Sequence, residues 1–223
     1  MGTKVYIYRS FERFWHWMQA FLIFFLAATG FEIHGTIEFF GYENAAKYHN
    51  VAAYAFIVLI VFAIFWHFTT GEWKQYIPTT QHLKAQLNFY LFGIFKNVPH
   101  PTKKNVLSKL NPLQRLVYLS LKILVIPTMV ISGLLYMFFR YPQKGEITSL
   151  NIESIDVIAI FHTAGAFLLM AFVIVHLYLI TTGTTVTSNL KAIISGYEDL
   201  EDDDDHDTTI KNDNKISAEA SNE

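Results

Sequence analysis

Four long apolar stretches constrain this chain more than any other feature of its sequence. They cover about residues 14–34, 50–70, 112–139 and 155–182. A helix rises about 1.5 Å per residue, so each stretch holds the ~20 residues that cross a bilayer. The alternative is a set of buried helices in a large soluble core. Only 16% of the residues are charged, against roughly 25% in an ordinary soluble domain. We therefore predict an all-α, integral membrane four-helix bundle.

The charged residues divide the chain into two parts. Residues 1–197 carry 15 Lys/Arg and 8 Asp/Glu, whereas residues 198–223 carry 2 and 11. We predict that residues 1–197 form the transmembrane domain. Residues 198–223, including the run Asp202 to Asp205, have few apolar side chains to bury and predict a disordered acidic tail. Residues 81–97 repeat apolar side chains at helical spacing, which favours a short interfacial helix over a loop.

Lysine and arginine gather on one side of the predicted spans. That side has Lys4, Arg9 and Arg13 before the first span, and Lys74, Lys84, Lys96, Lys103, Lys104 and Lys109 between the second and third. The other side has only Lys47, Arg140 and Lys144. Short basic loops stay in the cytoplasm, so we expect both termini to be cytoplasmic in a bacterial inner membrane.

Five histidines lie within or at the ends of the spans: His16, His49, His67, His162 and His176. Ionisable groups at membrane depth are costly and indicate a functional site. His162 and His176 are 14 residues apart, so they share one helix face about 21 Å apart. Neutral imidazole is an axial ligand of haem iron, and bundles hold cofactors between facing helices. The spacing favours two haems at different depths.

The partner histidines follow from depth. His49 opens the second span and should pair with His162 on the outer side. His16, near the start of the first span, should pair with His176 on the inner side. His67 is the alternative inner ligand, because it lies 18 residues after His49 and shares its face about 27 Å away. That spacing matches the last span less well, so we favour His16.

Cysteine is absent. This excludes disulfides, thiolate ligands for an iron–sulfur cluster, and the thioether attachment of a c-type haem.

Several motifs together resemble the bacterial di-haem cytochrome b membrane subunits of nickel–iron hydrogenases, formate dehydrogenases and thiosulfate-reductase-type enzymes. They are Arg13-Phe14-Trp15-His16-Trp17, Thr29-Gly30, Tyr48-His49-Asn50, Asn111-Pro112-Leu113-Gln114-Arg115, Phe161-His162 and Val175-His176. The resemblance runs from about Tyr8 to Tyr197. It implies two haem b groups held by His16, His49, His162 and His176.

The resemblance also implies partners. These are membrane lipid, menaquinone or ubiquinone, and a periplasmic catalytic redox subunit or multihaem cytochrome, with no nucleic acid. In the formate dehydrogenase relatives the start of the third span lines the quinone pocket, which implies that role for Asn111, Gln114 and Arg115. The alternative is an ordinary helix start with Asn111 as N-cap and Pro112 at the first position. Lys122 either snorkels or pairs with a haem propionate.

We therefore expect a di-haem b-type cytochrome that transfers electrons between the quinone pool and an extracytoplasmic redox partner. It would be an enzyme at most in oxidising quinol or reducing quinone. One alternative is a stand-alone cytochrome b that donates to a soluble c-type cytochrome. A haem-free transporter, proton channel or anchor that contains histidines is another.

Overall fold

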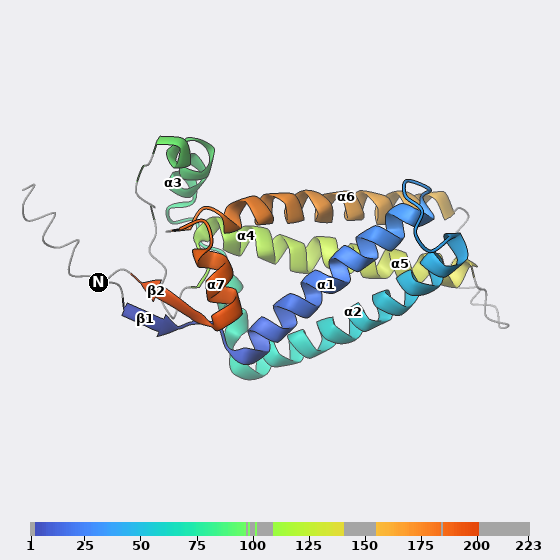
Figure 1. Ribbon diagram of the computed structural model, residues 1–223, viewed down its shortest axis with the longest axis horizontal. Coiled ribbons are helices and arrows are strands. Elements are labelled where there is room, and N and C mark those ends of the chain that lie inside the picture. Colours follow the sequence, from blue (N-terminus) through green and yellow to red (C-terminus); the bar gives the residue numbers. More distant parts are fainter. Residues whose placement is uncertain are drawn as a thin grey trace, which may run out of the picture.

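Four long helical segments run lengthwise beside one another in the computed structural model (Figure 1), which describes residues 3–96, 98, 101, 109–140, 155–183 and 185–200. They are α1 (Ser10–Ile33), α2 (Tyr42–Thr70), the continuous segment α4 (Pro112–Ser120), η4 (Leu121–Val125) and α5 (Ile126–Arg140), and α6 (Ile155–Ile180). Each of the four is long and apolar enough to cross a membrane. The predicted all-α membrane bundle is therefore confirmed, although α2 begins earlier than expected.

The outer faces of these helices are apolar. Phe21, Phe65, Ile123 and Phe167 each leave more than half of their surface exposed. A soluble monomer rarely exposes apolar patches of this extent, whereas lipid chains cover such faces without penalty. These exposed side chains contradict the alternative of a soluble core.

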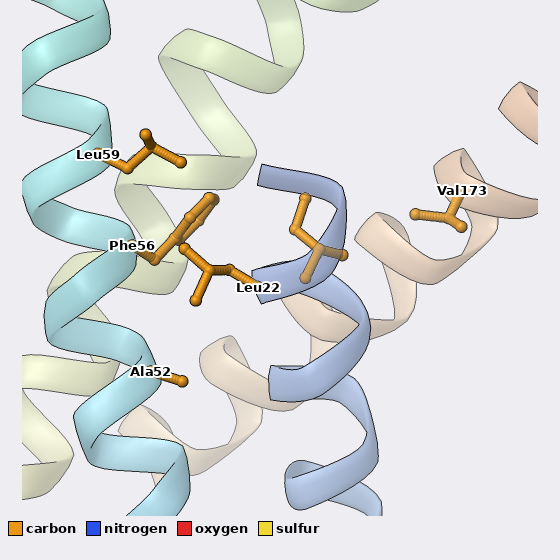
Figure 2. Packing of buried hydrophobic residues seen from close by; sticks show 6 residues of the cluster. Leu22, Ala52, Phe56, Leu59 and Val173 are labelled. Carbon is orange, nitrogen blue, oxygen red and sulfur yellow. The ribbon is translucent and has the colours of Figure 1, made fainter. Parts of the chain in front are cut away.

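The helices form two hairpins. One contains α1 and α2; the other contains α4–η4–α5 and α6. A buried apolar cluster lies midway along the bundle and joins them, comprising Leu22, Ile23, Ala52, Phe56, Leu59 and Val173. Figure 2 shows Phe56 of α2 beside Leu22 of α1, with Val173 contributed by α6. The middle of the bundle is therefore filled by apolar side chains.

Both ends of the described chain meet at one end of the bundle. β1 (Thr3–Tyr6) pairs antiparallel with β2 (Tyr197–Leu200), next to α7 (Ser188–Ser195) (Figure 1). Gly196 has φ 89°, and a Cβ there would lie 2.6 Å from the Tyr6 ring, so only glycine fits. We call this the ribbon end. Residues 198–200, expected in the tail, lie in β2; residues 201–223, with Asp202 to Asp205, lie outside the described residues.

The opposite end, which we call the loop end, carries the connection from α1 to α2. Glu32 is almost fully buried there. Its Oε1 accepts hydrogen bonds from the backbone N–H groups of Phe39, Phe40 and Gly41 at 2.9, 2.6 and 2.7 Å. One carboxylate oxygen thus holds the whole connection against the end of α1, satisfying backbone groups that would otherwise lack partners.

The helix predicted between the second and third spans is present. α3 (Leu83–Asn88) continues through a π-helical turn, η2 (Phe89–Gly93), and a 3-10 turn, η3 (Ile94–Lys96). A second short 3-10 helix, η1 (Glu72–Tyr76), follows α2 directly. Three lysines used to predict the orientation, Lys103, Lys104 and Lys144, lie outside the described residues.

Candidate functional site

Two pairs of histidines face one another across the two hairpins. At the ribbon end, the ring centres of His16 on α1 and His176 on α6 are 6.2 Å apart. At the loop end, the ring centres of His49 on α2 and His162 on α6 are 6.3 Å apart. Helix α6 thus contributes one histidine to each pair, and the first hairpin contributes the other. The structure brings together the same two pairs that depth predicts.

The spacing within each pair suits a metal ion between two imidazoles. An imidazole nitrogen lies about 1.1 Å from its ring centre and bonds a metal at about 2.0 Å. Two imidazoles that shared one metal ion would therefore have centres no more than about 6.2 Å apart. Both observed separations agree with this value, so the residues present fit a bis-histidine haem iron at each end.

His49 is oriented by a hydroxyl group on the neighbouring helix. Thr29 is fully buried in α1, and its hydroxyl donates to the Phe25 carbonyl at 2.9 Å. Because the hydroxyl proton is engaged in that bond, the Thr29 oxygen acts as an acceptor and receives a hydrogen bond from His49 Nδ1 at 2.9 Å. A Cβ on Gly30 would lie 3.6 Å from His49 Cε1, in ordinary contact. His49 is thereby fixed with Nε2 available as a ligand.

His162 has the same environment on the other hairpin. The Ser132 hydroxyl in α5 donates to the Thr128 carbonyl at 2.5 Å and accepts from His162 Nδ1 at 3.0 Å. A Cβ on Gly133 would lie only 3.2 Å from His162 Cε1. Glycine therefore lets this ring lie directly against α5.

The ribbon-end pair is held less tightly. His176 Nδ1 lies 3.4 Å from the Tyr118 hydroxyl, and the His176 ring stacks on Phe172. His16 Nδ1 is buried and has no hydrogen-bond partner among the residues that the structure describes. A buried nitrogen of this kind calls for a partner beyond the described residues, such as a bound group.

His67 faces no other histidine in the described part of the chain. Its Nδ1 donates to the Ala63 carbonyl at 2.6 Å, and its Nε2 accepts from the Tyr76 hydroxyl at 3.2 Å and the Lys122 ammonium at 3.3 Å. Burial, together with the negative charge of Glu12, raises the pKa of Tyr76, so its hydroxyl remains a donor. Both ring nitrogens of His67 are therefore already occupied.

The residues expected at the quinone pocket lie at the ribbon end, at the start of α4. Asn111 and Gln114 bond to each other's backbone N–H groups at 2.8 and 3.1 Å, which forms a capping box. Asn111 Nδ2 also donates to Tyr90, whose pKa is raised by burial. Arg115 Nε donates to the Leu110 carbonyl at 3.1 Å. These bonds stabilise the helix start that the alternative interpretation describes.

Sequence reasoning missed three partners of the histidines: Thr29 and Ser132 as hydrogen-bond acceptors, and Tyr118. A signal for two of them was present. In both Thr29-Gly30 and Ser132-Gly133 a hydroxyl residue directly precedes a glycine within a predicted span. The glycine admits an imidazole from the facing helix, and the adjacent hydroxyl supplies its acceptor.

A membrane-spanning helical bundle with facing histidine pairs between its hairpins is the architecture of a membrane cytochrome b. In agreement, the chain matches the family described as prokaryotic cytochrome b561 over residues 7–196, and it belongs to that family. Members of this family bind haem b and take part in electron transport. The resemblance to bacterial cytochrome b subunits noted in the sequence is therefore confirmed.

Two curated relatives are similar along most of the chain. The putative cytochrome YdhU of Escherichia coli (strain K12) is 29% identical over 203 residues, which cover 88% of this chain and 75% of that protein. The probable Ni/Fe-hydrogenase B-type cytochrome subunit of Rhizobium leguminosarum bv. viciae is 26% identical over 222 residues, which cover 89% of this chain and 92% of the relative.

Proposed function

We propose that this protein is a di-haem cytochrome b that carries electrons across the membrane between the quinone pool and an extracytoplasmic redox partner. The main support is the presence of two facing histidine pairs at opposite ends of one apolar bundle. Haem, when bound, supplies the one-electron redox chemistry. The polypeptide binds the two groups, fixes their separation and excludes water between them.

In this proposal His16 and His176 hold the ribbon-end haem, and His49 and His162 hold the loop-end haem. Thr29 and Ser132 accept hydrogen bonds from the Nδ1–H groups of the loop-end pair, so each imidazole presents its Nε2 lone pair. His67 is not a ligand in this scheme, because both of its nitrogens already have partners.

The apolar cluster between the two pairs has a defined role in this function. Phe56, Leu22 and Val173 fill the middle of the bundle (Figure 2). Among the described residues, this cluster offers no polar side chains along which a proton could follow the electron. Electrons can cross such a distance through packed protein, so the cluster would separate electron transfer from proton leakage.

We place the ribbon end in the cytoplasm, because the basic connections lie on that side. Quinone would then bind beside α4, at the level of His176. Asn111, Gln114 and Arg115 would shape the wall of this site by fixing the start of α4. The extracytoplasmic partner would meet the loop end. The Rhizobium relative is named as a hydrogenase subunit, which favours a catalytic oxidoreductase as that partner.

The first test is haem binding. The purified full-length chain, expressed with ample haem, should give the reduced-minus-oxidised spectrum of low-spin haem b and two haems per chain. His49→Ala and His162→Ala should each remove the loop-end haem, and His16→Ala and His176→Ala the ribbon-end haem. Each variant should retain one haem per chain, because the two pairs share no ligand.

His67→Ala is the matched control, since it removes a buried histidine of the same bundle. It should keep two haems. One haem in His67→Ala with two in His16→Ala would make His67 the inner ligand. Two haems in His49→Ala would refute the loop-end pair. In the wild-type chain a menaquinol or ubiquinol analogue should reduce both haems, and failure to do so would exclude the quinone step.

A further inference from the structure

Lys122 is a lysine within the third membrane-spanning segment, in the π-helical turn η4. Its ammonium lies 3.3 Å from His67 Nε2. It also lies 3.3 Å from the centre of the Tyr76 ring and 5.3 Å from the centre of the Trp15 ring. We call Lys122, His67, Tyr76 and Trp15 the lysine cage. The cage draws on three separate segments, α1, the α2–η1 region and η4.

The cage contains no negative charge. His67 donates its Nδ1 proton to the Ala63 carbonyl and accepts at Nε2, so its ring is neutral. Tyr76 also stays neutral, since burial raises its pKa. Among the described residues, no carboxylate lies within ion-pair distance of Lys122. Aromatic faces attract an ammonium, but they do not neutralise it.

Lys109, at the same end of the bundle, is a buried lysine that does form ion pairs and can be compared with Lys122. Its ammonium lies 2.7 Å from Glu12 and 3.2 Å from Glu72, so two carboxylates surround one cation. An isolated charge in a membrane segment is costly, and such charges usually pair. The contrast indicates that the counter-charge of Lys122 comes from outside the residues that the structure describes.

The cage lies next to the ribbon-end histidine pair. Trp15 immediately precedes His16 in α1. Lys122 follows Tyr118 by four residues along the same helix, and the Tyr118 hydroxyl contacts His176. Two of the three segments of the cage, α1 and the α4–η4 helix, thus also carry a group of the ribbon-end site.

We propose that Lys122 is the counter-charge of a carboxylate of the ribbon-end haem, one of its propionates. This inference rests on the proposed function, because the carboxylate arrives with the cofactor. The pair would neutralise two charges that are each costly at this depth. A cation held close to the iron favours the added electron, so Lys122 would raise the reduction potential of this haem.

The test is a redox titration of the purified, haem-loaded full chain, with both haems followed by absorbance. Lys122→Met should lower the midpoint potential of the ribbon-end haem and leave that of the loop-end haem unchanged. Lys122→Arg should preserve the wild-type value. Lys191→Met is the matched control, because it removes a water-exposed lysine of α7. It should leave both potentials unchanged.

The ribbon-end haem can be titrated alone in a His49→Ala background, which isolates the signal. Should Lys122→Met fail to fold, Lys122→Gln removes the same charge while keeping a donor. Unchanged potentials in a folded, charge-free variant would overturn the inference. So would unchanged potentials with weaker reduction by a quinol analogue, since the ammonium would then face quinone. A wild-type chain without two haems would instead contradict the proposed function itself.

Discussion

At the scale of single residues, the loop-end histidines are distinguished by how their second nitrogen is used. Thr29 and Ser132 each direct their own proton to a carbonyl of the preceding helical turn. Their oxygens can then only accept, and each accepts a hydrogen bond from an imidazole N–H group. A ligand held in this way has one tautomer and one ring orientation, which increases its basicity toward a metal.

Thr29→Val should therefore weaken haem binding at the loop end about 10-fold, within the usual range for losing such a partner. Valine keeps the shape of the side chain but leaves the His49 Nδ1–H without an acceptor. Ser132→Ala should act in the same way on His162. Haem titration of the purified variants measures the effect.

Thr69→Val is the control for this comparison. Thr69 also donates to the carbonyl four residues earlier, that of Phe65, but it has no histidine partner among the described residues. It should bind both haems as the wild-type chain does. Equal loop-end affinity in Thr29→Val and Thr69→Val would show that the hydroxyl does not act on His49.

The histidine pairs could be predicted from the sequence because helical periodicity fixes both the face and the depth of a residue. The hydroxyl partners could not. Threonine and serine in helices usually bond to their own backbone, as Thr69 does, and only the facing helix reveals a second role. The environment of His67 could not be predicted either, since Lys122 is 55 residues away in the sequence and Tyr76 reaches the ring only through the turn into η1.

At the scale of elements, a glycine in α5 controls how closely α6 approaches. A Cβ on Gly133 would lie 3.2 Å from His162 Cε1, tighter than an ordinary contact, whereas the corresponding distance for Gly30 is 3.6 Å. Gly133→Ala should therefore displace His162 and reduce loop-end haem content, while Gly30→Ala should be nearly neutral. Haem content per chain, with ribbon-end haem as internal standard, measures both. Equal losses would refute this steric ranking.

The spans themselves were predictable because length and hydropathy alone define a membrane helix. The π-helical turn η4 was not, since a wider turn leaves the apolar composition unchanged. It nevertheless contains Lys122, and such turns often occur at functional sites. The β1–β2 ribbon was also missed. It pairs two four-residue segments from opposite ends of the chain, and an isolated ribbon has little stability of its own.

At the scale of the whole molecule, the two ends of the bundle differ in polarity. Among the described residues, the ion pairs lie at the ribbon end, where Lys109 joins Glu12 and Glu72. A reporter fused to the C-terminus should read cytoplasmic, and one inserted near Lys144 should read external. The measurement is reporter activity in intact cells. The opposite pattern would invert the proposed orientation and move quinone to the other side.

Helix α6 sets the distance between the two histidine pairs. It provides one histidine to each pair, and their 14-residue separation within one continuous helix sets the distance between the two sites at about 21 Å. Under the proposed function, loops can therefore lengthen or shorten without changing the gap that an electron would cross. In the proposed di-haem protein, the number of residues between His162 and His176 would set the distance of electron transfer, and with it the rate.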